Sequence, residues 1–465
     1  MGEIIGQRAV VLGGGIAGLL AARVLADAYR QVVVVDRDRI TDAAGPRRGV
    51  PHDPHAHALQ PRGQQVLEDL FPGFTAELTA AGRPVGEMAG DLRWYFLGRR
   101  IRPAHAGLRF LGGPRPELEA HVRARVADLP GVEFRDRRIV RGLATSEGGA
   151  RVTGVHLVRQ SGGASETIEA DLVVDATGRG SRTPAWLAEL GYRRPVEDRV
   201  KVDLAYTTRR YRLTADPFGR DLSINSVASP LNPRGAFFIK LPGGTAQLSL
   251  TGVLGDHPPT DPEGFLAFAE TLSAPEIHAA VKDAEPLDEP VMFRFPASVR
   301  RRYERLERFP AGLLVVGDAV CTFNPVYGQG MTVAALEALA LRRLLRGGVE
   351  PAPLAFFKAI TPAVDAPWDI AAGGDLAFPE VDGPRPAKVR IGNAYLARVQ
   401  AAAVHDAKVT EAFFRVAGLV DPPQALFRPG LVFRVFRALR RDRRNAPVAP
   451  AAAAVRPASR EDRAA

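Results

Sequence analysis

A glycine-rich turn near the start of the chain constrains the fold more than any other feature. Residues 10–18 read Val-Val-Leu-Gly-Gly-Gly-Ile-Ala-Gly, which fits the pattern G-x-G-x-x-G directly after an apolar strand expected over residues 8–12. A helical pattern without proline follows over residues 16–28, and four valines at 32–35 predict a second, buried parallel strand. The chain is therefore expected to begin with a strand–helix–strand unit.

The glycines, together with the acid after the second strand, predict a dinucleotide site. Gly13 permits the tight turn, Gly15 lets the backbone approach a pyrophosphate, and Gly18 lets helix and strand pack closely. Free N–H groups at the helix N-terminus attract phosphate. Asp36, 23 residues after Gly13, is placed to accept hydrogen bonds from an adenosine ribose and to repel a 2′-phosphate. The pattern favours FAD or NAD at this position rather than NADP.

Two later strands also end in glycine-containing segments. Residues 171–178 read Asp-Leu-Val-Val-Asp-Ala-Thr-Gly and residues 313–319 read Leu-Leu-Val-Val-Gly-Asp-Ala. Residues 324–331 read Asn-Pro-Val-Tyr-Gly-Gln-Gly-Met, and a long helix is expected over 331–345. An aspartate at a strand end, here Asp318, can bind a ribityl hydroxyl, and a helix N-terminus can stabilise the negative charge of a reduced flavin ring. These segments predict the flavin side of an FAD site.

With these three motifs, the chain resembles the single-component, para-hydroxybenzoate-hydroxylase-like flavoprotein monooxygenases over residues 8–345. The resemblance implies that Arg115 reaches the FAD ribose and phosphate and that the backbone of Val140 meets the adenine. Within the family, the motifs look most like those of the epoxidases of polyether antibiotic biosynthesis. The residues implied to bind non-covalent FAD are Gly13, Gly15, Ile16, Ala17, Gly18, Asp36, Arg37, Arg47, Gly49, Val50, Arg115, Val140, Thr177, Gly178, Gly317, Asp318, Pro325, Gly328, Gln329, Gly330 and Met331.

The chain departs from the family pattern at Thr177, where the family usually has an aspartate that helps orient the nicotinamide cofactor. Direct reduction by NADPH or NADH is therefore expected to be slow. Electrons could instead arrive through a separate flavin reductase. A second departure is Thr332, which replaces a common asparagine after the glycine loop.

Two histidines in a proline-rich loop are the candidate catalytic residues. His55 and His57 follow the segment Arg47-x-Gly49-Val50. A metal site is not expected there, because the sequence nearby has no further cluster of Cys and His residues. Two interpretations stay open: the imidazoles lie near the flavin ring, or they make structural hydrogen bonds. Cys321 is the one cysteine of the chain, so no internal disulfide is possible, and a small packing role is expected for it.

Composition sets broad limits on partners and location. The chain has 465 residues, a net charge of +10 and a pI near 10.1, with arginines spread along its whole length. The sequence has no basic stripe interleaved with aromatic residues, which is the pattern that would predict nucleic-acid binding. The start of the chain shows neither a signal peptide nor a membrane span, which favours a cytoplasmic protein. Residues 428–441 mix arginines with apolar residues, as in a packed terminal helix or in a segment that touches a membrane surface.

The predicted fold class is α/β, with a Rossmann-like FAD-binding domain interrupted by an antiparallel-sheet substrate domain, and with a helical C-terminal region. The predicted parts are residues 1–80, 105–200 and 300–345 for the FAD domain, 81–104 and 201–299 for the substrate domain, 346–445 for the helical region, and 446–465 for a disordered tail.

The resemblance implies a monooxygenase of secondary metabolism, such as antibiotic biosynthesis. Through a flavin C4a-hydroperoxide, it would insert one oxygen atom from O₂ into a lipophilic small molecule. Epoxidation of an alkene needs no protein base, whereas hydroxylation of a phenol would favour one. The main alternative is an FAD-dependent reductase or dehydrogenase of polyprenyl-type double bonds, which consumes no O₂. A halogenase is disfavoured because the chain contains no Trp-x-Trp-x-Ile-Pro segment. A non-catalytic flavin-binding protein is the remaining class.

Overall fold

A parallel sheet of five strands lies at the centre of the nucleotide-binding part. The computed structural model describes residues 3–40, 45, 47 and 49–445, so the predicted tail at 446–465 lies outside the described residues. The strand order is β19-β12-β1-β2-β8, and every neighbouring pair is parallel. The strands are β1 (Gly6–Leu12), β2 (Tyr29–Val35), β8 (Val132–Arg135), β12 (Leu172–Asp175) and β19 (Leu313–Val315). The expected opening unit is confirmed, with its helix α1 at Ile16–Leu25.

The two faces of this sheet are covered differently. Alternate β1 residues, Ala9 and Val11, pack into a helical core, whereas Val10 and Leu12 pack against a second sheet. This alternation follows from the period of two along a strand. The core helices are α1, α2 (Pro61–Leu70), α4 (Arg115–Ala127), α8 (Gly330–Leu345) and α9 (Pro353–Asp375). The second sheet is antiparallel and consists of β9 (Arg138–Thr145), β10 (Val152–Arg159) and β11 (Glu166–Glu169).

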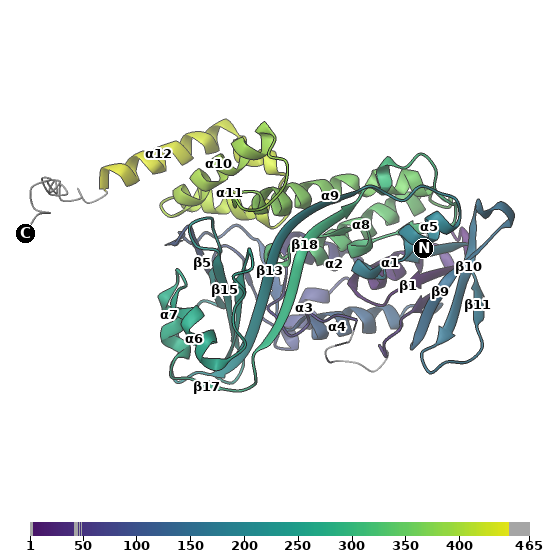
Figure 1. Ribbon diagram of the computed structural model, residues 1–465, viewed down its shortest axis with the longest axis horizontal. Coiled ribbons are helices and arrows are strands. Elements are labelled where there is room, and N and C mark those ends of the chain that lie inside the picture. The colour runs from purple at the N-terminus through teal and green to yellow at the C-terminus, as the bar shows by residue number, and fades with distance from the viewer. Residues whose placement is uncertain (1–2, 41–44, 46, 48, 446–465) are drawn as a thin grey trace, which may run out of the picture.

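A larger, mostly antiparallel sheet extends away from the parallel one. Its longest strands, β13 (Glu197–Arg212) and β18 (Val291–Arg301), run side by side from the nucleotide-binding part to the far end of the molecule (Figure 1). The other members are β5 (Leu92–Phe96), β6 (Arg99–Arg100), β14 (Ser223–Ser226), β15 (Arg234–Leu241), β16 (Thr245–Gly252), β17 (Glu285–Pro286) and β20 (Cys321–Thr322). One neighbouring pair, β14 and β5, is parallel. Helices α6 (Pro262–Glu270) and α7 (Pro275–Val281) pack on it through Phe265 and Ile277.

Regular structure follows directly after the proline-rich loop that contains His55 and His57. Ala58–Leu59 form strand β3, which joins β7 (Arg109–Gly112) and β4 (Val85–Glu87) in a small sheet. Helix α2 begins at Pro61, since proline at the first helical position has a suitable φ and loses no hydrogen bond. Helix α3 (Phe74–Ala80) follows it.

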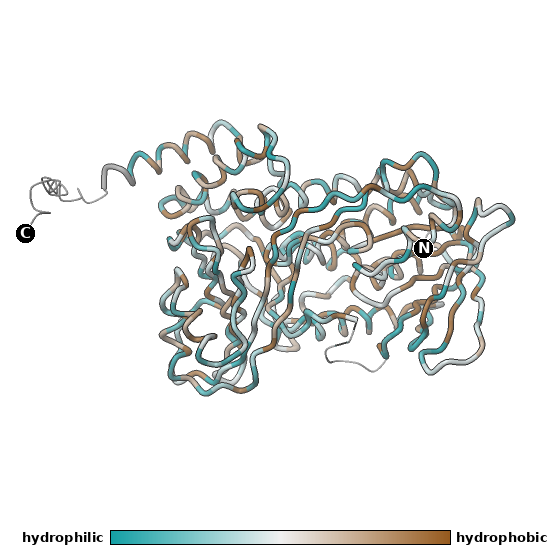
Figure 2. The backbone as a smooth tube through the Cα atoms, viewed as in Figure 1, coloured by the Kyte–Doolittle hydropathy of each residue, from teal (hydrophilic) through white to brown (hydrophobic). Residues whose placement is uncertain are grey.

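The C-terminal region is helical, as predicted. It contains α10 (Ala387–Ala403), α11 (Ala407–Ala417) and α12 (Pro429–Asn445), which stand together at one side of Figure 1. Among the described residues, no helix has the length and apolar character needed to cross a membrane. The hydropathy colouring in Figure 2 shows hydrophobic segments running through the interior strands, with hydrophilic segments on the outer turns.

Candidate active site

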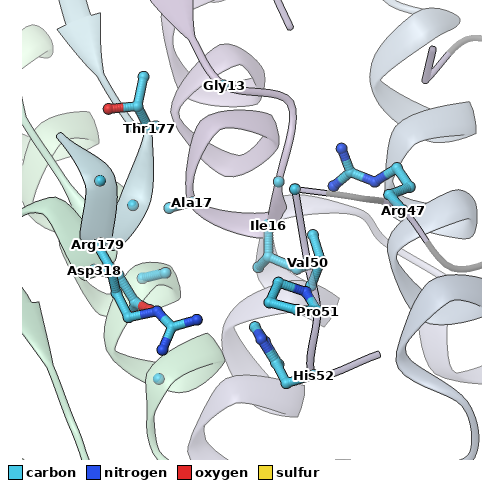
Figure 3. Close-up of a pocket in the computed structure, with 18 of the residues that line it drawn as sticks. Gly13, Ile16, Ala17, Arg47, Val50, Pro51, His52, Thr177, Arg179 and Asp318 are labelled. Atoms are coloured by element: carbon cyan, nitrogen blue, oxygen red, sulfur yellow. The ribbon is translucent and has the colours of Figure 1, made fainter. Parts of the chain in front are cut away.

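A cavity of about 870 Å³ lies where the carboxyl ends of the parallel strands meet β13 and β18 (Figure 3). In open parallel sheets, ligands bind at the carboxyl ends of the strands. Every site residue predicted from the sequence lines this cavity except Gly18. Three segments far apart in the sequence therefore face one space, although their role in FAD binding stays a prediction.

The three glycines of the first motif meet different surroundings. A Cβ atom on Gly13 would lie 2.5 Å from the carbonyl oxygen of Ala176, and Gly13 has a φ of +101°. A Cβ atom on Gly18 would lie 1.8 Å from the carbonyl oxygen of Gly13. A Cβ atom on Gly15, by contrast, would have its nearest neighbours 3.9 and 4.0 Å away. The protein's own packing thus explains Gly13 and Gly18, while Gly15 faces free space beside the N-terminus of α1.

Asp36 stabilises the turn as well as facing the cavity. Its Oδ2 atom accepts a hydrogen bond of 2.7 Å from the backbone N–H of Gly14, and its Oδ1 atom accepts one of 2.7 Å from Asp38. The Arg47 guanidinium lies 3.5 Å from Oδ2. Each carboxylate oxygen can accept a further hydrogen bond, so these contacts leave capacity for a ribose hydroxyl.

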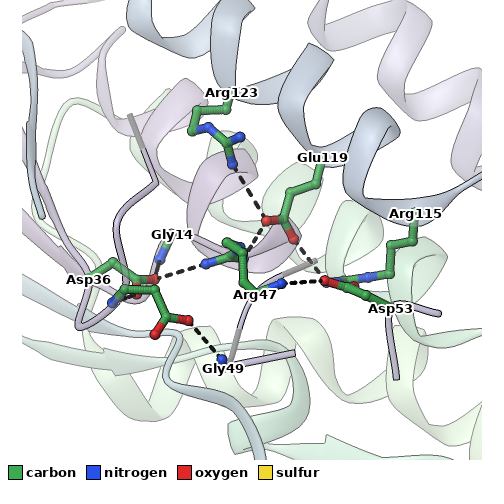
Figure 4. Close-up of polar contacts among 9 residues, drawn as sticks. Gly14, Asp36, Arg47, Gly49, Asp53, Arg115, Glu119 and Arg123 are labelled. Carbon is green, nitrogen blue, oxygen red and sulfur yellow. Dashed lines mark hydrogen bonds and ion pairs between the residues drawn. The ribbon is translucent and has the colours of Figure 1, made fainter. Parts of the chain in front are cut away.

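A buried ion-pair network holds Arg47 and Arg115, two of the arginines predicted to bind FAD (Figure 4). Glu119 on α4 contacts Arg47, and its Oε2 atom lies 3.0 Å from Arg115. Arg115 also donates a 2.6 Å hydrogen bond to Asp53, and Arg123 lies 3.6 Å from Glu119. Because side chains with little exposure lose little further entropy on binding, the network preorganises both cations at the cavity wall.

The second motif is held by one buried carboxylate. Asp175, at the end of β12, is fully buried and accepts hydrogen bonds from the Thr177 N–H (2.9 Å) and the Thr177 hydroxyl (2.6 Å). The hydroxyls of Ser181 and Thr183 donate to its other oxygen at 2.5 and 2.6 Å. The Thr177 side chain is therefore engaged by the protein's own turn.

The third motif also rests on a buried acid. The Gly317 N–H donates a 2.6 Å hydrogen bond to Glu337 on α8, and burial raises the pKa of Glu337 to about 8. Asp318 follows on the cavity wall, and burial raises its pKa as well. The loop before α8 is fixed by Gln60, which donates 2.6 Å to the carbonyl of Tyr327. The predicted helix start is confirmed, so the N-terminus of α8 faces the cavity.

The opposite end of the cavity is aromatic. Tyr206 on β13 and Phe293 on β18 are direct partners in the sheet, so both side chains lie on the same face. The His55 ring lies 5.7 Å from the Tyr206 ring and 5.8 Å from the Phe293 ring, centre to centre. His52 lies 5.7 Å from Phe293, and the Arg179 guanidinium lies 5.3 Å from the centre of that ring.

The three histidines of this loop are neutral at physiological pH. Burial lowers the pKa of His52 to about 2, with a further contribution from Arg115. Burial lowers the pKa of His55 to about 4 and that of His57 to about 3. His57 Nδ1–H donates to the carbonyl of His55 at 2.9 Å, and His55 Nδ1 lies 2.8 Å from the Thr208 hydroxyl. Both candidate catalytic histidines thus make hydrogen bonds that hold the loop.

Several residues of the site were not among those predicted from the sequence. His52 could have been found, since it stands three residues before His55 in the same loop. Tyr206 and Phe293 give no local signal, because alternating strands hold many aromatic residues that face no cavity. Asp53 acts through Arg115 and Glu119 acts through Arg47, and only the tertiary structure reveals these two contacts. The spacing of four residues between Glu119 and Arg115 is visible in the sequence.

This fold and cavity define the class of α/β proteins that bind a dinucleotide at the carboxyl edge of a parallel sheet. Residues 7–347 match the model of the FAD binding domain family, and the chain belongs to that family. The match confirms the resemblance to the para-hydroxybenzoate-hydroxylase-like flavoproteins, supports FAD as the cofactor and identifies an oxidoreductase. The narrower likeness to polyether epoxidases stays a prediction.

Alignments with one protein sequence and two solved structures cover most of the chain. Protein Rv3254 of Mycobacterium tuberculosis (strain ATCC 25618 / H37Rv) is 37% identical over 428 residues, which cover 89% of this chain and 90% of that protein. A flavoprotein/dehydrogenase from Cytophaga hutchinsonii aligns with a TM-score of 0.66 at 16% identity, covering 92% of this chain and 96% of the other. The p-nitrophenol 4-monooxygenase PnpA from Pseudomonas putida DLL-E4 aligns with a TM-score of 0.63 at 16% identity, covering 90% and 99%. At such identities the two structures show a shared fold.

Proposed function

We propose that this protein is an FAD-dependent monooxygenase that inserts one oxygen atom from O₂ into a lipophilic small molecule. The observation that carries the proposal is one continuous cavity with two chemically different ends. The glycine turn and a network of arginines and carboxylates line one part of it, and aromatic rings and neutral imidazoles line another, with the Arg179 guanidinium over the Phe293 ring. Such a cavity suits a charged dinucleotide next to an uncharged substrate.

The residues at the first end fit FAD. The open space before Gly15 is what a pyrophosphate needs, since a side chain there would occupy it. The N–H groups at the start of α1 would bind the phosphates, Asp36 the adenosine ribose, and Arg115 the ribose and phosphate. Asp318 would bind the ribityl chain, and the N-terminus of α8 would lie beside the flavin ring. FAD bound there would supply the redox chemistry and the activation of O₂.

The residues at the second end would bind the substrate and exclude water. Tyr206, Phe293 and His52 offer apolar surface without charge of their own, because burial lowers the pKa of His52 to about 2. Dry surroundings protect a reactive oxygen species from competing reactions. We assign this role to the predicted substrate domain at 81–104 and 201–299, together with the loop around His55. The motifs shared with polyether epoxidases favour an alkene as the substrate and a place in antibiotic biosynthesis.

Electrons would come from NADPH or NADH, directly or through a separate flavin reductase. Thr177 favours the indirect route, because its hydroxyl is bound to Asp175 and it lacks the carboxylate that the family uses to orient the nicotinamide cofactor.

The experiment that tests the function uses the reduced holoprotein, isotopically labelled O₂ and a panel of polyenes and phenols. We expect O₂ consumption coupled to a product that contains one labelled oxygen atom. Gly15→Val, expected to lack FAD, is the negative control. Saturation of a double bond without consumption of O₂ would instead establish the polyprenyl-type reductase. Oxidation of the flavin without any product from the panel would leave only a flavin-binding protein and contradict the proposal.

A further inference from the structure

Helix α12 has an exposed face that combines aromatic and basic side chains. Phe433 and Phe436 are 67% and 45% exposed. Arg437, Arg440 and Arg441 are exposed as well. These positions are separated by three and four residues, so they form one stripe along the helix. We call these five residues the outer stripe of α12.

The opposite face of α12 is already used for packing. Val435 and Ala438 are buried in a cluster with Val399 of α10 and Phe413 of α11, and Leu431 packs against the same cluster. The helix is therefore held in place, and its outer stripe points away from the body of the protein. In Figure 2 the turns of α12 alternate between hydrophobic and hydrophilic, and in Figure 1 the helix stands at the edge of the molecule.

The charge of the outer stripe indicates which kind of surface can bind to it. Residues 429–441 contain no acidic residue. Asp406, the N-cap residue of α11, accepts a 2.8 Å hydrogen bond from Arg434, which lies outside the stripe, and is 3.8 Å from Arg437. A two-fold contact with a second copy would bring the three arginines of each stripe together, and Asp406 is the one described carboxylate that contacts a stripe arginine. The stripe instead fits a surface with apolar depth and negative charge.

We propose that the outer stripe of α12 docks the protein on an anionic lipid bilayer. Phe433 and Phe436 would enter the boundary between headgroups and acyl chains, and Arg440 and Arg441 would contact lipid phosphates. Arg437 lies beside Asp406 and over the Phe433 ring. The inference rests on α12 alone and does not depend on the proposed reaction.

Sedimentation of the full-length protein with vesicles tests this docking. One vesicle set contains phosphatidylcholine alone, and the other contains phosphatidylcholine with phosphatidylglycerol. We expect binding to the anionic set, weakened by added salt. The double variants F433S/F436S and R440Q/R441Q should each lower the partition coefficient about tenfold or more. Their flavin content should equal that of the wild type, because the exposed side chains hold no part of the site.

Matched controls distinguish binding through the outer stripe from nonspecific adsorption through other exposed apolar or basic residues. L231S/V196S removes two hydrophobic residues that are 89% and 62% exposed elsewhere, and R343Q/R346Q removes two exposed arginines at the end of α8. Both controls should bind vesicles as the wild type does. Equal binding of all variants, or no preference for anionic vesicles, would overturn the proposal. A wild-type dimer that F433S/F436S dissociates, without vesicle binding, would assign the stripe to a second copy instead.

Discussion

The carbonyl oxygen of Gly13 lies so close to Gly18 that a Cβ atom on Gly18 would be only 1.8 Å from it. Helix α1 and the turn are therefore in contact through a glycine that no other residue can replace. Gly15, two residues after Gly13, has no such neighbour within 3.9 Å. The contrast distinguishes a glycine needed by the fold from one that leaves room for a ligand.

Gly15→Val should therefore leave the fold intact and abolish FAD binding. The added side chain enters the space proposed for the pyrophosphate, while its Cβ atom would meet no atom of the apoprotein closer than 3.9 Å. The melting temperature of the wild type should rise with added FAD, as expected for a ligand that binds the native state alone, and that of the variant should stay constant. Gly392→Val, at an open position on α10, should keep both fold and flavin. Gly18→Val should fail to fold. Normal flavin content in Gly15→Val would show that the phosphates bind elsewhere.

Asp36→Ala should weaken FAD binding by about 1–3 kcal/mol, the scale of a lost hydrogen bond to a charged group. It should also destabilise the apoprotein, because the N–H groups of Gly14 and Asp38 lose their acceptor. Asp36→Asn keeps one oxygen acceptor and should lose less stability. Titration of the apoprotein with FAD, followed by flavin fluorescence, gives the affinity. Asp27→Ala, at the end of α1, is the control, and an affinity unchanged by Asp36→Ala would remove Asp36 from the site.

Glu337 should make the stability of the apoprotein fall with rising pH. Its pKa is raised by burial from 4.5 to about 8, so the folded chain holds a proton that the unfolded chain releases. The protonated Glu337 therefore contributes to the free energy of unfolding in full below about pH 4.5. This contribution is lost as the pH rises through about 8, and the free energy of unfolding falls by up to about 1.4 kcal/mol per pH unit. Glu337→Gln imitates the neutral acid and keeps an acceptor for Gly317.

Urea unfolding at several pH values between these limits measures the effect. The advantage of Glu337→Gln over the wild type should grow as the pH rises. The exposed Glu270→Gln should follow the wild type within about 0.5 kcal/mol. A constant difference between Glu337→Gln and the wild type across the range would mean that Glu337 is ionised in the folded protein.

Reduction of the bound flavin by NADPH or NADH should be slow, below ~10 s⁻¹ without substrate, because geometry limits hydride transfer. A separate flavin reductase should speed turnover. Thr177→Asp should accelerate direct reduction if FAD still binds, although it places a carboxylate beside Asp175 and so costs stability. Thr177→Ser keeps the hydroxyl and serves as the control. Stopped-flow absorbance gives the rates, and fast reduction of the wild type would contradict the expected role of Thr177.

The sequence by itself determined the elements that depend on short-range chemistry. The glycine turn, Asp36 at the end of β2, and the motifs after β12 and β19 were predictable, because each needs particular residues within a few positions of one another. Helix α9 was not singled out, since Pro362 and Pro367 lie inside it and proline is a weak helix former.

Only the tertiary structure decided what surrounds these elements. Tyr206 and Phe293 come together through strand pairing across 87 positions of the chain, and no local pattern marks that register. Glu119 contacts Arg115 and Arg123 along its own helix, but it reaches Arg47 only because α4 packs beside the loop that contains that arginine. The neutral state of His52 likewise depends on burial by distant segments, since the cost of desolvating a charge is set by all the atoms around it.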